Sequence, residues 1–259
     1  MVGSQKHDDT GEKHAGYLWL CICIFGTLST LTLYGITLEY VTTGGRKLHE
    51  VSFLFVTTSI YALTAYTARW IFGETPNENI SKYQMLTLSV TSIASTYTSV
   101  RSLRYVIYPV QILFKSCKPV PVMIFGRILG KRFSMQKYVN VMIIVSGVAL
   151  FMAGGSSSQG SSQVSDAIFT GAVLLSISLA FDGATGAYED KLMGSDHVGP
   201  FDLMYNIQLG KAVISFCVLV AINELGSFVE TIQDGGFMLL VLGFTGALGQ
   251  VSLTFSLNI

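Results

Sequence analysis

Long apolar runs dominate the chain, and short polar segments that hold most of the charges separate them. A helix rises about 1.5 Å per residue, so about 20 apolar residues are needed to cross the hydrocarbon core of a bilayer. The pattern predicts eight spans of this kind, roughly Gly16–Ile36, Val51–Phe72, Tyr83–Leu103, Val106–Leu129, Tyr138–Ala153, Ala167–Tyr188, Phe201–Ile222 and Gly236–Leu257. We therefore expect an all-α fold, a polytopic bundle of eight transmembrane helices.

The third span differs from the others because it carries eight serines and threonines between positions 87 and 99. Such a helix is a poor match for lipid on all sides, so we expect it to pack centrally. It must end before the fourth span, because one helix from Tyr83 to Leu129 would be about 70 Å long in a hydrocarbon core of about 30 Å. The segment from Arg101 to Pro109 is where we expect the break.

Composition agrees with a membrane protein, since half of the 259 residues are hydrophobic and only 12% are charged, against roughly 25% in soluble domains. The formal net charge is zero, so no basic surface for nucleic acid is predicted. The polar start and the long run after it predict an uncleaved signal anchor. The cysteines Cys21, Cys23, Cys117 and Cys217 lie in apolar runs, which is typical of packing residues.

The distribution of basic residues favours a cytosolic N-terminal tail, residues 1–15. With that orientation eight lysines and arginines fall on the cytosolic side and at most four on the other. The cytosolic eight are Lys6, Lys13, Lys82, Arg127, Lys131, Arg132, Lys137 and Lys191, and the other four are Arg46, Lys47, Arg101 and Arg104. The sequon Asn79-Ile80-Ser81 would then face the cytosol and stay unglycosylated.

The fourth span carries a polar stripe with two lysines. Tyr108, Gln111, Lys115 and Lys118 fall within an arc of about 80° on a helix. Pro119 and Pro121 follow at once and allow the helix to bend. Ionisable residues deep in a membrane are costly and usually functional, so the stripe predicts a site for an anion such as a phosphate. The alternative is that the lysines extend to an interface, which is strained for Lys115 because it lies about ten residues from either end.

Other polar residues inside the spans are weaker candidates. Asp182 is placed to pair with a buried lysine, whereas Glu189, Asp190 and Lys191 are typical of a solvated helix end. Asn206 and Gln208, with Lys211 farther in, are able to contact a base or sugar, although bonds to neighbouring helices are the commoner use. The series Gly243, Gly246 and Gly249 predicts close helix packing, and Gln250 beside it is able to line a cavity.

The sequence gives little support to an enzyme. It has no Gly-x-Ser-x-Gly elbow, no Walker loop and no metal-spaced cluster of histidines and carboxylates. The histidines His7, His14, His49 and His197 all lie in the tail or in loops. We expect no enzymatic activity, no metal and no cofactor.

Several segments resemble one family of carriers, solute carrier family 35, subfamily B. The resemblance rests on the run from Tyr108 to Met123 with its Lys-Ser-Cys-Lys-Pro core, on Lys137-Tyr138, and on Gly147 to Met152. It also rests on Leu179-Ala-Phe-Asp182-Gly183 with Glu189-Asp190, on Met204 to Leu209, and on Gly246 to Gln250. The likeness covers nearly all of the chain beyond the tail, and the Lys-Ser-Cys-Lys-Pro core is similar to the endoplasmic-reticulum branch described as UDP-galactose transporter homologues.

The resemblance implies a ten-helix drug/metabolite transporter fold made of two inverted five-helix repeats. Residues 16–154 would form the first repeat, 155–165 a Ser/Gly-rich linker, and 166–259 three helices of an incomplete second repeat. The family's ninth helix, with a Thr-Thr-Thr-Arg-Lys run expected to help bind phosphate, has no counterpart here. We therefore expect a chain truncated at its C-terminus.

The function implied by the resemblance is exchange of a nucleotide-sugar, UDP-galactose or UDP-glucose, for a nucleoside monophosphate across an endoplasmic-reticulum or Golgi membrane. Its partners would be that substrate and the lipid bilayer, with no nucleic acid, and the oligomeric state stays open. The expected substrate-binding residues are Lys115, Lys118, Tyr108, Gln111, Asn206 and Gln250. The alternatives are ATP/ADP exchange into the endoplasmic reticulum and, in a different class, a non-transporting membrane interaction protein.

Overall fold

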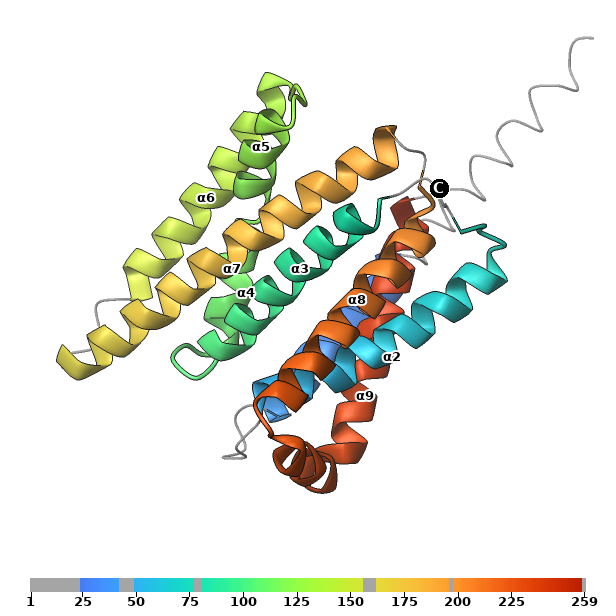
Figure 1. Ribbon diagram of the computed structural model, residues 1–259. Helices are drawn as coiled ribbons and strands as arrows, with labels where there is room; N and C mark the ends of the chain where they lie inside the picture. Colours follow the sequence, from blue (N-terminus) through green and yellow to red (C-terminus); the bar gives the residue numbers. More distant parts are fainter. Residues whose placement is uncertain (1–23, 42–48, 77–80, 156–161, 196–197, 258–259) are drawn as a thin grey trace, which may run out of the picture.

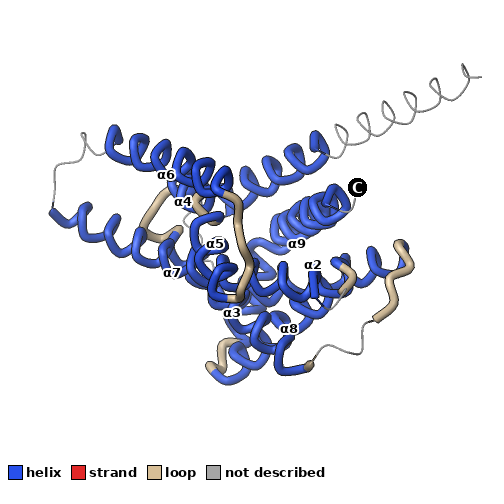
Figure 2. Tube along the Cα trace, turned by 90° about the horizontal axis from the view of Figure 1, so that it is seen from above, coloured by secondary structure: helices blue, strands red, loops and turns tan. Residues whose placement is uncertain are grey.

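The computed structural model describes residues 24–41, 49–76, 81–155, 162–195 and 198–257, and all regular structure in these segments is helical (Figures 1 and 2). A first helix occupies residues 24–41. The helices that follow are α2 (Glu50–Ile71), α3 (Lys82–Ser102), α4 (Tyr108–Ser116), α5 (Pro119–Ile128), α6 (Met135–Gly155), α7 (Ser162–Ser195), α8 (Pro200–Ala221) and α9 (Leu225–Leu257). The predicted all-α fold is confirmed. The tail and most of the sequon at 79–81 lie outside the described residues.

The predicted spans agree best with α2, α3 and α8, whose ends lie within one residue of the expected positions. Four predicted spans are too short. The first helix continues to residue 41 instead of ending at Ile36, and α6 (Met135–Gly155) exceeds the predicted Tyr138–Ala153 at both ends. Helix α7 (Ser162–Ser195) exceeds the predicted Ala167–Tyr188, and α9 begins at Leu225 instead of Gly236. The difference is physical, because an apolar run measures the thickness of hydrocarbon whereas a helix continues into the polar layer beyond it.

The helices form two groups that lie side by side (Figures 1 and 2). Helices α3, α4, α5, α6 and α7 make one group, and α2, α8 and α9 with residues 24–41 make the other. The principal packing partners join early and late parts of the chain, since α2 packs on α8 and α9, and α7 packs on α3 and α5. Contacts between α3 and α8 connect the two groups, so α3 has the central place expected from its hydroxyl-rich sequence.

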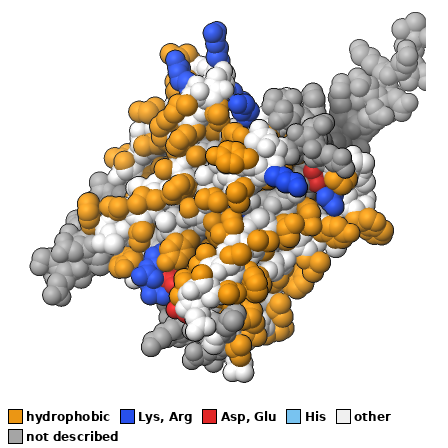
Figure 3. Space-filling view, in the orientation of Figure 1, with side chains coloured by type: hydrophobic (Ala, Val, Ile, Leu, Met, Phe, Trp, Pro, Cys, Tyr) orange, Lys and Arg blue, Asp and Glu red, His pale blue; other side chains and the backbone are white. Residues whose placement is uncertain are grey.

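The side chains are arranged with apolar groups outward and many hydroxyl groups inward. Large apolar side chains such as Trp70, Ile128 and Leu150 are more than 70% exposed. Hydrophobic side chains cover much of the face of the molecule seen in Figure 3. Buried positions include Ser95, Ser99, Ser178, Thr57 and Thr185. This distribution is opposite to that of a water-soluble protein and suits a bilayer as solvent.

Length and hydropathy alone mark three of the described helical segments as able to cross a membrane: Glu50–Ile71, Phe169–Gly194 and Pro200–Ala221. Two shorter apolar segments are Met135–Phe151 and Gly236–Ser252. Helix α3 is long enough, but its serines and threonines make its mean hydropathy too low. Helices α4 and α5 are too short, because one span is divided between them.

Two hydroxyl groups fix α3 against α7. Ser95 Oγ donates to the Ser178 carbonyl oxygen at 3.0 Å, and Ser178 Oγ donates to the Ser95 carbonyl oxygen at 2.9 Å. Farther along the same pair, Thr185 Oγ1 donates to Thr91 Oγ1 at 3.0 Å. Both Ser95–Ser178 bonds form only when α3 and α7 lie at one position along each other's axes.

Glycines allow other helices to approach closely. A methyl group at Gly246 of α9 would overlap the Tyr61 hydroxyl and lie 2.9 Å from a ring carbon of Tyr34, and one at Gly243 would overlap Ile60. At Gly249 the nearest atoms, in Leu31 and Thr30, lie at 3.3 Å. The close packing predicted for this glycine series is therefore confirmed.

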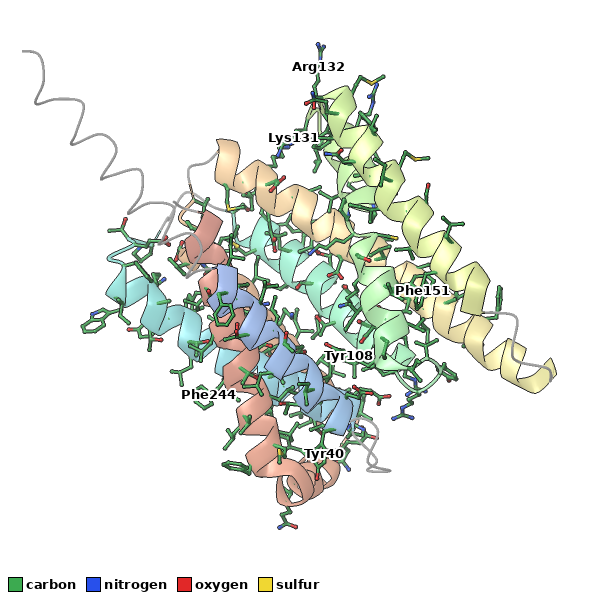
Figure 4. The ribbon with its side chains drawn as sticks, turned by 180° about the vertical axis from the view of Figure 1, so that it is seen from behind. Tyr40, Tyr108, Lys131, Arg132, Phe151 and Phe244 are labelled. Carbon is green, nitrogen blue, oxygen red and sulfur yellow. The ribbon has the colours of Figure 1, made fainter. Side chains whose placement is uncertain are left out.

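Charged residues gather at the two opposite ends of the bundle, with an apolar band between them (Figure 3). At one end Glu50 is buried and forms ion pairs with Arg101 at 3.1 Å and Arg104 at 2.7 Å, while His49 pairs with Glu224. At the other end Arg69 pairs with Asp202 and Lys131 with Asp190. Lys131 and Arg132 mark this second end in Figure 4.

Candidate functional site

The predicted bend of the fourth span is a complete break between α4 and α5. Only Cys117 and Lys118 separate the two helices, which have 9 and 10 residues. The Lys118 N–H donates to the Lys115 carbonyl oxygen at 3.0 Å, which closes a tight turn. Pro119 and Pro121 supply no N–H, so the helical ladder cannot continue through this point. The break places both lysines near the middle of the span.

Lys115 lies in the last turn of α4 and faces α7. Its ammonium lies 3.8 Å from the Asp182 carboxylate, and Asp182 is in the interior of the 34-residue α7. The Lys115 side chain is 44% exposed and that of Asp182 is 24% exposed. The ammonium is thus directed at a carboxylate in mid-helix, and not at a helix end as the alternative reading of Lys115 required.

Lys118, on the other side of the break, also faces α7. It lies near Gly186 and Glu189, one to two turns beyond Asp182 along that helix. A methyl group at Gly186 would lie 3.9 Å from Lys118 Cε, and the charge of Lys118 interacts with Glu189. Asp182, Gly186 and Glu189 are spaced by four and three residues, so they share one face of α7. That face is the partner of the broken helix.

The reading of Glu189 as part of a solvated helix end is wrong. Glu189 is only partly exposed and interacts with Lys118 and Lys211. Its neighbour Asp190 does lie at the surface, where it pairs with Lys131 at 2.7 Å. Helical spacing from Asp182 is the sequence signal that would have identified Glu189.

Lys211 of α8 completes the site from the other group of helices. Its side chain is buried, and Nζ donates to Thr96 Oγ1 of α3 at 3.1 Å. Its charge interacts with Asp182, Glu189 and Lys115. Lys211 is not among the substrate-binding residues expected from the sequence, because nothing in a single helix shows which neighbours it meets.

We name these five residues, Lys115, Lys118, Asp182, Glu189 and Lys211, the interior charge cluster. Three ammonium groups and two carboxylates leave one net positive charge. Lys211 is buried and attracted by both carboxylates, whereas Lys115 and Lys118 are exposed and their attraction to Asp182 and Glu189 is weaker. The remaining positive charge makes the cluster suited to an anion.

Tyr108 and Gln111 lie on the predicted stripe but bond elsewhere. The Gln111 side chain is buried, and its Nε2 donates to the Ser99 carbonyl oxygen at 2.9 Å and to Ser99 Oγ at 2.7 Å. Tyr108 packs against the apolar cluster around Leu38 and Val100, beside Gly35, and Figure 4 shows it on α4 facing the first helix. In this conformation both residues position α4.

Asn206 and Gln250 also lie outside the interior charge cluster. Asn206 Nδ2 donates to the Asp202 carbonyl oxygen of its own helix at 2.8 Å. Gln250 Oε1 accepts a hydrogen bond from Gln208 Nε2 at 3.1 Å, which joins α9 to α8. The other amide atom, Gln208 Oε1, is buried and has no partner in the part of the chain that is described.

Comparisons with known proteins give one consistent result. The model of the UAA transporter family matches residues 19–242, which include the whole interior charge cluster. Solute carrier family 35 member B1 of Bos taurus is 32% identical over 245 residues, which are 90% of this chain and 76% of that protein. The proteins of the same name from Xenopus tropicalis and Dictyostelium discoideum are 31% and 27% identical over 252 and 254 residues; these cover 93% of this chain in both cases and 78% and 64% of the relatives.

Proposed function

This chain belongs to the UAA transporter family of polytopic membrane proteins, and we propose that it exchanges a nucleotide-sugar for a nucleoside monophosphate. The proposed substrate is UDP-galactose or UDP-glucose, and the proposed location is an endoplasmic-reticulum or Golgi membrane with the N-terminus in the cytosol. The observation that carries the proposal is the interior charge cluster, with its excess of one ammonium group, at a break in a transmembrane helix.

A broken helix suits substrate binding inside a membrane. Irregular backbone at membrane depth is tolerated where protein or an aqueous site surrounds it, and transporters use such breaks at their binding sites. Lys115 and Lys118 flank the break between α4 and α5. Their ammonium groups would neutralise a diphosphate. Tyr108, Gln111, Asn206 and Gln250 remain proposed contacts for base or sugar in a conformation that releases their present partners.

The opposite ends of the bundle supply contacts for alternating access. The Arg69–Asp202 pair joins α2 to α8 at one end, and the His49–Glu224 pair joins the segments before α2 and α9 at the other. Both of these pairs lie within the group of α2, α8 and α9, whereas Glu50 of α2 with Arg101 of α3 joins the two groups at one end. We expect contacts between the groups to separate in an open state. In this proposal residues 16–154 and 166–259 are the inverted repeats, and each packed group that moves contains helices of both.

The proposal is tested by counterflow into proteoliposomes preloaded with UMP, with labelled UDP-galactose and UDP-glucose outside. The wild-type chain is expected to accumulate label. Lys115→Ala is expected to abolish accumulation because the diphosphate loses its partner, and Lys115→Arg is expected to restore little, since a planar fork does not replace a compact ammonium. Lys82→Ala, a change at the exposed start of α3, is the matched control and should retain uptake.

Uptake retained in Lys115→Ala would refute the assignment of the site. Labelled ATP against internal ADP distinguishes the second candidate, an ATP/ADP exchanger, which three ammonium groups would also serve. Absence of counterflow with every nucleotide and nucleotide-sugar would favour the membrane interaction protein instead.

A further inference from the structure

Lys211 is a charged group whose surroundings do not satisfy it. It lies in the middle of the 22-residue α8 and its side chain is only 6% exposed. An ammonium has three donors, and among the described residues the one hydrogen bond that Lys211 makes is to the neutral hydroxyl of Thr96. Asp182 and Glu189 act on it through charge but form no ion pair with it within the described residues. A buried charge with one neutral partner is expensive, and in a membrane span such a residue usually has a functional role.

Asp182 lies between two lysines of the cluster. It forms the ion pair with Lys115 of α4, and it is also the carboxylate that acts most strongly on Lys211 of α8. Lys115 and Lys211 in turn repel one another. Two ammonium groups that share one small anionic group make a position that a phosphate, with its several charged oxygens, would fill better than a single carboxylate.

A second unsatisfied group lies one turn before Lys211 on α8. Gln208 is 5% exposed, and its Oε1 has no hydrogen-bond partner in the described part of the chain. Residues three apart on a helix share a face. An ammonium with free donors and an amide with a free acceptor, side by side and buried, indicate a ligand that offers both negative oxygens and hydrogen-bond donors.

We propose that Lys211 is a third cationic contact for the phosphate chain of the substrate, with Asp182 and Glu189 as its counterions in the empty carrier, and that it sets the preference for ligands with two or more phosphates. This inference rests on the proposed function and deepens it. Gln208 Oε1, on the same face, would accept a hydrogen bond from a hydroxyl or N–H group of the ligand. The remaining alternative is that Lys211 only ties α8 to α3 through Thr96.

Binding of inorganic anions to the purified full chain in detergent tests the role directly. Phosphate, pyrophosphate and tripolyphosphate are titrated while the melting temperature is followed, for the wild type, Lys211→Met, Thr96→Val and the exposed control Lys82→Met. Lys211→Met is expected to weaken binding of pyrophosphate and tripolyphosphate about tenfold and of phosphate much less, because a single phosphate already has Lys115 and Lys118. Lys82→Met should match the wild type.

Thr96→Val distinguishes a role of Lys211 in ligand binding from a purely structural role in linking α8 to α3. It removes the hydroxyl bond and leaves the charge, so a ligand-binding Lys211 predicts little change in pyrophosphate affinity, whereas a mere tie predicts the same loss as in Lys211→Met. Equal affinities of wild type and Lys211→Met for all three anions, or equal losses in Lys211→Met and Thr96→Val, would overturn the inference.

Glu189→Gln provides an independent variant should Lys211→Met fail to fold. Loss of this counterion is expected to strengthen pyrophosphate binding several-fold, and unchanged or weaker binding would contradict the proposal. Failure of the proposed function would give a different result. Pyrophosphate would still bind in a way that depends on Lys211, but no nucleotide would show counterflow. The anion site would then stand, and the assignment of transport would not.

Discussion

Ion pairs of similar chemistry have different environments in this molecule. Arg69 and Asp202 are 17% and 2% exposed at 2.8 Å, and the Arg69 guanidinium lies 5.5 Å from the Tyr66 ring centre and 4.7 Å from that of Tyr205. Lys131 and Asp190 are 49% and 43% exposed at 2.7 Å. Removing one partner of a buried pair leaves an uncompensated charge, whereas solvent screens an exposed one.

Asp202→Ala is accordingly expected to reduce the free energy of unfolding by about 3–5 kcal/mol. Asp190→Ala, the matched change in the exposed pair, is expected to reduce it by no more than about 1 kcal/mol. Unfolding in detergent, followed by helical circular dichroism, measures both. Similar losses in the two variants would mean that burial does not govern these pairs.

Asp182 competes with an anionic substrate for Lys115. Their 3.8 Å pair is partly exposed and worth about 1 kcal/mol, so Asp182→Asn is expected to lower the KM for substrate about fivefold. Uptake at a series of substrate concentrations measures this, with Asp190→Asn as the control. A higher KM in Asp182→Asn would show that the carboxylate positions Lys115 instead of competing for it.

At the scale of helices, contact between α5 and α7 depends on one glycine. A methyl group at Gly183 would overlap Pro121 Cβ and lie 2.8 Å from the Pro121 carbonyl carbon, so backbone would have to move. At Gly186, one turn farther on the same helix, the nearest atom is Val122 Cγ2 at 3.5 Å, an ordinary contact. The close approach at Gly183 brings the α7 carboxylates to the broken helix.

Gly183→Ala is therefore expected to destabilise the protein by about 1–3 kcal/mol through overpacking and to reduce transport, while Gly186→Ala leaves both nearly unchanged. Melting temperature and counterflow of the two variants are the measurements. If Gly186→Ala were the more damaging change, the packing of α7 against α5 would differ from that described.

The sequence predicts the helices well because the signal for each is local. Apolar length locates α2 and α8, the hydroxyl-rich run between two charged ends locates α3, and two prolines locate the break after Lys118. The interior charge cluster is only half predictable, because it depends on which faces of distant helices meet. Lys115 and Lys118 were identified on one helix, whereas the inward direction of Glu189 and the neighbours of Lys211 follow from the packing of α7 and α8.

For the whole molecule, the two charged ends determine how the bundle lies in a membrane. Glu50, Arg101 and Arg104 gather at one end and Arg69, Asp202 and Lys131 at the other, with the apolar surface between them (Figure 3). Charged groups avoid hydrocarbon, so these ends should face the two aqueous compartments.

Cysteine labelling tests that orientation in sealed vesicles. In a variant without the native cysteines, Arg104→Cys and Lys131→Cys are expected to react with a membrane-impermeant maleimide from opposite sides, and Lys131→Cys from the cytosolic side. Both original side chains are about half exposed, so the new thiols should be accessible. Labelling of both variants from one side would contradict the arrangement of the ends.

The paired serines of α3 and α7 have a consequence for motion. Sliding one helix along the other would break both Ser95–Ser178 bonds at once and take from two buried hydroxyl groups their acceptors on the neighbouring helix. We therefore expect α3 and α7 to move together as one rigid body during a transport cycle. The contact between α3 and α8 is held in part by the Lys211–Thr96 bond and in part by a 3.4 Å bond from Ser89 Oγ to the Ile207 carbonyl oxygen. An anion bound by Lys211 would remove the first of these bonds and so weaken the contact between the two groups of helices.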